Sequence, residues 1–94
     1  MKTFLISGSI VDTDADRMTF EDVTPAQVNS FLNGLADNEE AVLEITSYGG
    51  SVSAGLAICN LLKKVSAEGH KTTAHVIGIA ASMASAIACA CDTL

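Results

Sequence analysis

The sequence predicts an α/β fold in which strands and helices alternate along a single domain, residues 1–94. Short runs of strand-forming residues precede segments whose apolar residues recur at helical spacing. Glycine, proline and hydroxyl residues stand where these helical segments start or stop. Apolar residues make up 49% of the chain, which is enough for a globular core. We therefore expect a mostly parallel sheet with right-handed crossovers.

The first half of the chain predicts one strand and one helix. Residues 3–11 form the predicted strand, with Gly8 at a bulge or bend. Residues 12–22 are polar and acidic, and they predict an exposed connection rather than a calcium loop, because the required glycine and final glutamate are missing. A helix over residues 24–36 starts with Thr24 as its cap, and Gln27 completes a capping box.

The second half repeats this alternation twice. Residues 41–46 predict a strand that leads into a glycine turn, and residues 53–68 predict a helix that ends at Gly69. Residues 72–79 predict a third strand and residues 82–91 a third helix. Residues 92–94 are interpreted as the start of a fourth strand.

Charge and composition exclude several classes of partner. The net charge is −6, and the only close basic pair is Lys63-Lys64, which argues against nucleic acids and anionic membranes. Residues 76–91 carry no charge, but they are too short and too rich in small residues to span a bilayer. Three cysteines without a signal-peptide pattern predict a cytoplasmic protein. Cys89 and Cys91 are interpreted as core residues, so we expect no metal and no cofactor.

Two turns carry the candidate chemistry, residues 47–51 (SYGGS) and residues 78–85 (GIAASMAS). Ser82 lies at a strand-to-helix junction, where a hydroxyl stands clear of the backbone and the next amide helps to hold an oxyanion. Gly49 and Gly50 allow the earlier turn to bend sharply and to present a second amide. No Gly-Lys-Ser/Thr follows this turn, which excludes a P-loop.

Together the two turns resemble those of the ClpP-like serine peptidases, and the resemblance extends from about residue 23 to the C-terminus. In that family a Ser-Pro-Gly-Gly turn supplies an oxyanion-hole amide, and a turn such as Ala-Ser-Met-Gly carries the nucleophile. Residues 80–85 are most similar to the phage head-maturation branch. The resemblance implies a site with Ser82 as nucleophile, the amides of Gly50 and Met83 as oxyanion hole, and Gly49 and Ser51 as substrate-binding residues.

The resemblance also implies the ClpP/crotonase-like β-α-β spiral, with this chain as the N-terminal part of a ClpP-like protease domain, truncated after the third helix. Tyr48 replaces the usual proline. The family's histidine and aspartate follow the nucleophile helix and are not among these residues. His75 does not replace that histidine, because five strand residues span about 16 Å, and His70 lies further back. We therefore expect the 94 residues alone to be inactive. Ser85 lies one helical turn after Ser82, and we expect it to be a packing residue.

Partners follow from the same resemblance. It implies a homo-oligomeric ring, a peptide or protein substrate, and an AAA+ unfoldase or phage capsid proteins as further partners.

Two other functions stay open at this point. One is a crotonase-type acyl-CoA enzyme, which shares the spiral and a two-amide oxyanion hole but needs no serine at position 82. The other is a non-catalytic oligomeric assembly module.

Overall fold

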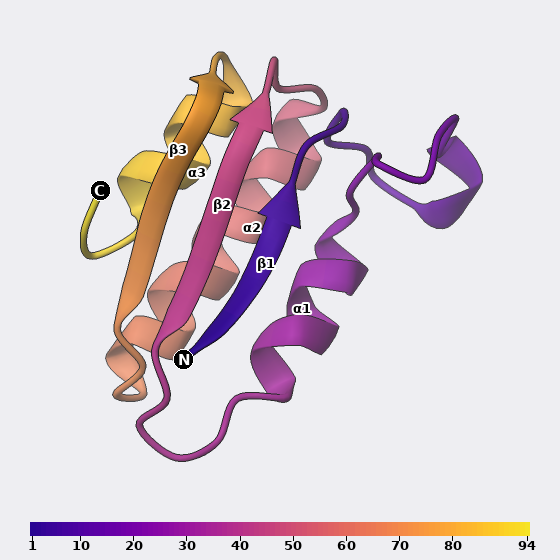
Figure 1. The fold of residues 1–94 in the computed structure, drawn as a ribbon. Coiled ribbons are helices and arrows are strands. Elements are labelled where there is room, and N and C mark those ends of the chain that lie inside the picture. Colours follow the sequence, from indigo (N-terminus) through magenta and orange to yellow (C-terminus); the bar gives the residue numbers. More distant parts are fainter.

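The computed structural model describes residues 1–94 and confirms the mixed α/β fold (Figure 1). The elements follow one another as β1 (Lys2–Ile6), η1 (Asp14–Asp16), α1 (Pro25–Asn33), β2 (Ala41–Ser47), α2 (Val52–Ala67), β3 (Thr72–Ala80) and α3 (Met83–Ala90). None of the three helices is both long enough and apolar enough to cross a bilayer.

The three strands form one parallel sheet in the order β1-β2-β3. Every second residue of the central strand β2 is buried, from Ala41 to Ser47. Helices α2 and α3 cover one face of the sheet, while α1 lies beside β1 and packs against α2 (Figure 1). The other face carries no helix (Figure 1). Both crossovers return the chain to the same edge, so the carboxyl ends of the three parallel strands lie together.

The core is one cluster of 18 buried apolar residues between the sheet and its helices. All three strands and all three helices contribute, and aliphatic side chains dominate. The rings of Phe4 and Phe31 lie 5.2 Å apart and add an aromatic contact between β1 and α1. Members from successive elements include Ile6, Val28, Leu43, Ile58 and Ile87.

The predicted start of the first helix is confirmed. The Gln27 amide donates to Thr24 Oγ1 at 3.2 Å, and the Thr24 amide donates to Gln27 Oε1 at 2.9 Å. These two bonds satisfy donors that a helix start otherwise leaves open. The helix ends at Asn33, earlier than the predicted residue 36, because Gly34 follows as the C-cap.

The predicted first strand is too long. Strand β1 ends at Ile6, because the backbone of Gly8 comes so close to residues 21 and 22 that a side chain there would collide with them. The Gly8 amide donates to the Glu21 carbonyl at 3.1 Å instead of continuing in the sheet. Ile10 then forms isolated bridges to both Val23 and Gly50. The segment therefore leaves the sheet and runs alongside the glycine turn.

The chain after α3 begins a fourth strand, as predicted, but as a single bridge. Thr93 pairs with Thr73 in parallel, and the Ala74 amide donates to the Thr93 carbonyl at 2.8 Å. The carboxylate of Asp92 accepts hydrogen bonds from Ser66 Oγ at 2.7 Å and from the Thr72 amide at 2.9 Å. These bonds hold the end of α3 to the start of β3.

Candidate functional site

The two predicted turns are in contact at the carboxyl ends of β2 and β3. A methyl group on Gly49 would lie 2.8 Å from Ser82 Cβ, 2.9 Å from the Ala81 carbonyl oxygen and 3.0 Å from the Met83 amide nitrogen. Gly49 also has a φ of +105°, which favours glycine. Only a residue without a side chain allows the two backbones to approach this closely. The fold thus brings together two motifs that are separated by more than 30 residues of sequence.

Ser82 is exposed and has an unusual backbone conformation. It is the N-cap of α3 with φ 53° and ψ −126°, a region that non-glycine residues seldom adopt. Its side chain makes no capping hydrogen bond, so the hydroxyl is not used by the helix. A strained serine whose hydroxyl is free fits the geometry expected of a nucleophile turn.

Ser85 supports the Ser82 turn and is not the packing residue that the sequence predicted. Its side chain is exposed, and its hydroxyl donates to the Ser82 carbonyl at 2.7 Å. The small side chain lies one helical turn after Ser82 and reaches back to it. The expectation was wrong because an apolar surrounding sequence hid the polar contact, which depends on how the first turn of α3 is oriented.

The amides of Gly50 and Met83 are both open for an acceptor. Gly50 donates no hydrogen bond to another backbone or side chain. Met83 is the first residue of α3, so its amide has no acceptor within the helix, because no helical turn precedes it. The Met83 side chain is fixed against α2, where a methyl group on Gly55 would lie 2.9 Å from Met83 Cβ. Two open amides next to an exposed serine are the parts that an oxyanion hole requires.

Ser47 links the two turns, and the sequence argument assigned it no role. Its side chain is almost fully buried, with 1% of its surface exposed. Its carbonyl accepts from the Ala81 amide at 3.1 Å, and its hydroxyl accepts from the Gly49 amide at 3.1 Å and donates to the Gly8 carbonyl at 2.7 Å. The signal was present in the strand alternation, because a polar residue at a core position must find partners inside the fold.

The family comparison agrees with this geometry. The sequence model described as Clp protease matches residues 7–94. The chain belongs to the Clp protease family. A search among curated proteins finds no match to the chain. Membership in the Clp protease family relates the chain to protease-type enzymes, and the contact between the two turns lies wholly inside the matched residues.

Ser51 has structural partners in this Clp protease family chain. It caps α2, and its hydroxyl accepts from the Ala54 amide at 3.2 Å. The same hydroxyl donates to Asp12 Oδ1 at 2.8 Å. Tyr48 stands in the turn with 80% of its surface exposed. Substrate contacts at Ser51 and Gly49 remain predictions.

Neither histidine lies at the Ser82 turn. His70 precedes β3, and its Nδ1 is 2.9 Å from the Glu39 carbonyl oxygen. His75 lies in the middle of β3, with its Nδ1 4.0 Å from Glu44 Oε2 on the neighbouring strand. His70 therefore lies before β3, and His75 lies before the carboxyl end of that strand. The structure agrees with the prediction that these are structural or surface residues.

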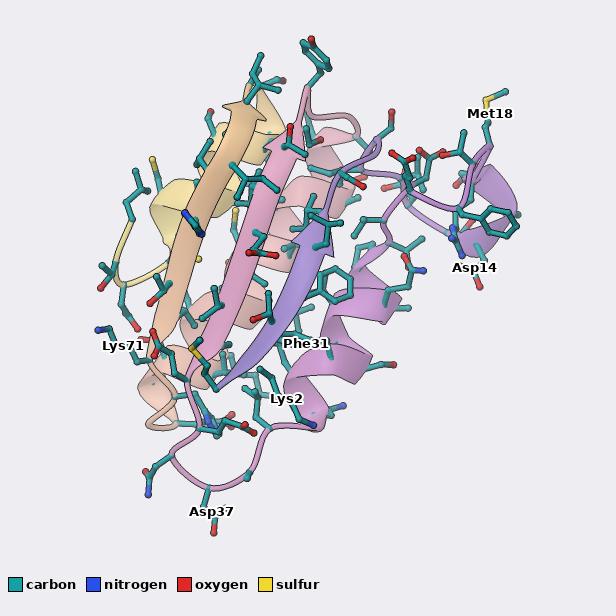
Figure 2. All side chains as sticks on the ribbon, in the orientation of Figure 1. Lys2, Asp14, Met18, Phe31, Asp37 and Lys71 are labelled. Carbon is teal, nitrogen blue, oxygen red and sulfur yellow. The ribbon has the colours of Figure 1, made fainter.

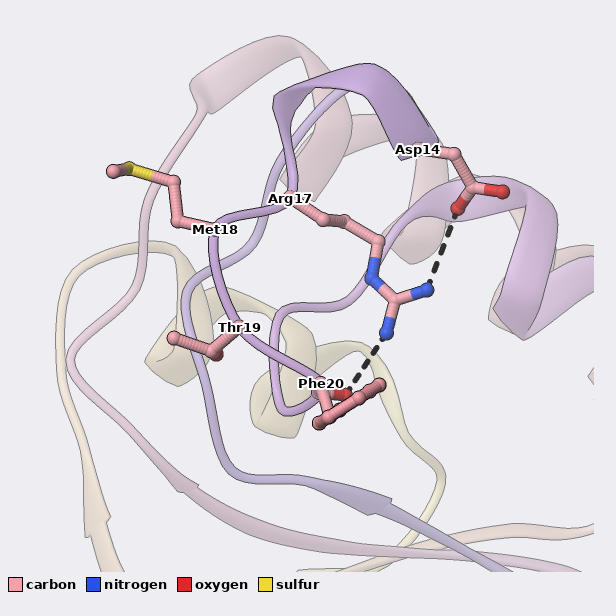
Figure 3. Close-up of a pocket in the computed structure, with 5 residues that line it drawn as sticks. All are labelled: Asp14, Arg17, Met18, Thr19 and Phe20. Carbon is pink, nitrogen blue, oxygen red and sulfur yellow. Dashed lines mark hydrogen bonds and ion pairs between the residues drawn. The ribbon is translucent and has the colours of Figure 1, made fainter.

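A hollow lies in the loop of residues 12–22, and Ser82 is not among the residues that line it (Figure 3). Arg17 crosses it, with an ion pair to Asp14 at 3.6 Å and a hydrogen bond to the Phe20 carbonyl at 2.9 Å (Figure 3). Met18 projects from the loop away from the sheet (Figure 2). The two oxygen-bearing side chains that line this hollow already have partners, because the Thr19 hydroxyl donates to Asp22 at 3.2 Å and the Asp14 carboxylate pairs with Arg17.

The cysteines do not form a metal site. No group of three or more histidine, cysteine, aspartate or glutamate side chains is placed to hold a metal ion. Cys91 is buried, as predicted, but Cys89 is exposed on α3, so the prediction that both are core residues was wrong for Cys89. Burial raises the pKa of the Cys91 thiol to about 11, and burial also raises the pKa of Cys59. Both buried thiols are therefore protonated at neutral pH, which makes them poor nucleophiles.

Proposed function

We propose that this chain carries the nucleophile and the oxyanion hole of a serine endopeptidase. The observation that supports the proposal most directly is the contact between the two turns, where a methyl group on Gly49 would lie within 3.0 Å of Ser82 Cβ and of the Met83 amide nitrogen. The amides of Gly50 and Met83 then belong to different turns beside one serine. This is the arrangement that stabilises an oxyanion during acyl transfer.

The proposed reaction is hydrolysis of a peptide bond in two stages. Ser82 Oγ attacks the peptide carbonyl carbon while a base takes its proton, and the carbonyl oxygen becomes an oxyanion. The Gly50 and Met83 amides donate to that oxygen. The tetrahedral intermediate collapses to an acyl-serine ester, and the proton passes to the departing amine. Water then attacks the ester by the same route and restores the free hydroxyl.

A serine peptidase accounts for the chain better than a crotonase-type enzyme. The strained conformation of Ser82, with φ 53°, has a cost that a two-amide acyl-CoA site would not require at that side chain. A turn that needs only its backbone amide is better served by glycine. The strain is reasonable if the hydroxyl itself takes part in the chemistry.

The proposed base is a histidine, held by an aspartate, from outside the 94 residues. It belongs to a further segment of chain or to a neighbouring subunit. Without it, the oxyanion hole alone gives an acceleration of about 10³–10⁴ over water, which is too slow to detect on ordinary peptides. We therefore expect the isolated residues 1–94 to show no measurable peptidase activity, and a chain extended through the histidine and aspartate to cleave a fluorogenic peptide.

The test is labelling of a chain extended through the histidine and aspartate with a serine-directed fluorophosphonate, followed by peptide mass mapping, because such reagents report a serine that a base activates. We expect a single adduct on Ser82, no adduct in Ser82→Ala, and normal labelling in Ser30→Ala, which removes an exposed hydroxyl from α1. Labelling spread over several serines, or equal labelling of Ser82→Ala, would contradict the assignment. An extended chain that cleaves peptides equally well with Ser82→Ala would also contradict it.

Within this function we propose that the protein assembles into a homo-oligomeric ring. We also propose that it is an enzyme of the head-maturation type, which acts in the cytoplasm together with an unfoldase or capsid proteins. The helix-free face of the sheet exposes 50% of Leu5 and 51% of Ile77. Such apolar surface favours contact with another subunit. Light scattering of the wild type and of a Leu5→Lys, Ile77→Lys variant tests this, and a wild type that stays monomeric at high concentration would contradict it.

A further inference from the structure

The position of the glycine turn is set by its neighbours, because its central residues have no side chains. Gly49 and Gly50 have φ values of +105° and +153°, conformations that few other residues adopt. A flexible turn of this kind does not hold an amide to within about 0.5 Å, as a catalytic site requires. Something outside the two glycines must therefore fix the Gly50 amide.

The backbone of Ile10 brackets the turn on both sides of Gly50. The Ile10 amide donates to the Gly49 carbonyl at 3.0 Å, and the Ile10 carbonyl accepts from the Ser51 amide at 2.8 Å. The contact is so close that any side chain on Gly50 would collide with the Ile10 carbonyl. This bracket determines where the turn lies, but it consists of only two backbone hydrogen bonds at an exposed edge.

Asp12 adds a charged contact two residues further along the same segment. Its Oδ1 accepts from Ser53 Oγ at 2.7 Å and from Ser51 Oγ at 2.8 Å, and the two hydroxyl oxygens lie 3.1 Å apart. The hydrogen bonds from Ser53 and then Ser51 lower the pKa of Asp12, so the carboxylate is ionised at neutral pH.

We propose that Asp12 is a positioning residue for the oxyanion hole, holding the Gly50 amide in place through the hydroxyls of Ser51 and Ser53. The inference rests on the proposed function of the Ser82 turn. Asp12 touches no reacting atom. It ties the residue after Gly50, and the first turn of α2, to the segment that brackets the turn. Charge-assisted hydrogen bonds of this kind are about twice as strong as neutral ones.

The first experiment measures amide hydrogen exchange by NMR in the 94-residue chain. Asp12→Ala removes the side-chain hydrogen bonds that hold Ser51 next to Ile10, so the backbone bond from the Ser51 amide to the Ile10 carbonyl should open more often. We therefore expect the Ser51 amide to exchange about tenfold faster, while the Leu43 amide in β2 exchanges at the wild-type rate. Asp12→Asn keeps an oxygen acceptor for both hydroxyls and should restore most of the protection. Unchanged Ser51 exchange in Asp12→Ala would overturn the proposal.

Two further variants keep this experiment decisive. Ser53→Ala removes one of the two hydroxyls without touching the α2 cap, so it should accelerate Ser51 exchange in the same direction even if Asp12→Ala fails to fold. Asp37→Asn removes one negative charge at the opposite end of the molecule (Figure 2) and should leave Ser51 exchange within about twofold of wild type. Equal acceleration in Asp37→Asn would show a general charge effect and would overturn the proposal.

The second experiment separates positioning from general stability. In the fluorophosphonate adduct of Ser82, the amide protons of Gly50 and Met83 should both shift downfield, because both donate to the phosphonyl oxygen. In the Asp12→Ala adduct only the Met83 shift should remain. A retained Gly50 shift would overturn the proposal. If the wild type forms no adduct, or if neither amide shifts, the proposed function fails, and the exchange measurement alone then decides whether Asp12 anchors the turn.

Discussion

Two regions of the molecule attract attention for opposite reasons, the loop of residues 12–22 and the junction of the two turns at Ser82. The loop has a surface hollow and the most exposed large apolar side chains, Met18 at 92% and Phe20 at 99% exposure. The junction instead has a free hydroxyl and two open amides.

The difference lies in how each region uses its polar groups. In the loop, the Asp22 carboxylate accepts from the amides of Met18 at 2.9 Å and Ser9 at 3.1 Å, and the Arg17 side chain bonds to the loop itself. Most of those groups are used to hold the loop closed, although the buried Nε of Arg17 has no partner. At the junction, Ser47 holds the two turns together through hydrogen bonds to Gly49 and Ala81, whereas the Ser82 hydroxyl and the neighbouring amides have no partner. Polar groups left available beside each other indicate a chemical site better than a concave surface does.

The largest expected effect comes from Gly49→Ala. The new methyl group would meet Ser82 Cβ at 2.8 Å, so strain and overpacking together should lower the free energy of unfolding by about 2–6 kcal/mol and abolish Ser82 labelling. Gly69→Ala is the matched control, because Gly69 has φ +101° but its nearest neighbour would be 3.5 Å away. It should cost only about 1–2 kcal/mol. Equal costs in urea unfolding would show that the two turns are not tightly packed.

Acid sensitivity tests how the loop is closed. Hydrogen bonds from the Met18 amide and then the Ser9 amide lower the pKa of Asp22 below its usual 3.8. The unfolded chain therefore binds a proton more readily, so this stabilisation is present above pH 3.8 and is lost as the pH falls through the lower folded pKa. Melting temperatures measured across this range should fall steeply for wild type and less for Asp22→Asn. An equally steep fall in the variant would contradict this account.

Ser82→Gly should separate stability from chemistry at the junction. Glycine adopts φ 53° and ψ −126° without strain, so the free energy of unfolding should rise by about 1 kcal/mol while labelling is lost. Ser82→Ala keeps a side chain at that position and should lose labelling without the gain in stability. A Ser82→Gly variant that is less stable than wild type would show that the serine is there for structure.

The smallest effects are expected in the loop. Phe20→Ser removes an exposed ring and should change the free energy of unfolding by no more than about 0.5 kcal/mol. The rate of phosphonate labelling at Ser82 should stay at the wild-type value, since the hollow lies away from the junction. A strong decrease in labelling would mean that the loop takes part in the site after all.

The elements were predictable because their signals are local. The Thr24 and Gln27 capping box, the alternation of β2 and the glycine after α2 lie within a few residues of the structure they determine. The length of the first strand was overestimated because residues 8–11 are strand-forming in type but pair outside the sheet. Their backbone pairs with residues 21–23 and with the glycine turn, a choice made by contacts that are distant in sequence.

The sequence by itself determined the alternating α/β fold, the two turns and the serine at the strand-to-helix junction, because residue type and short-range spacing decide these. The tertiary structure decided what surrounds them. It brought Gly49 within contact of Ser82, made Ser47 the link between the turns, and placed Asp12 against Ser51 and Ser53. The physical reason is that these contacts join strands and loops whose approach is fixed by packing of the whole sheet, and such packing leaves no pattern in any single stretch of sequence.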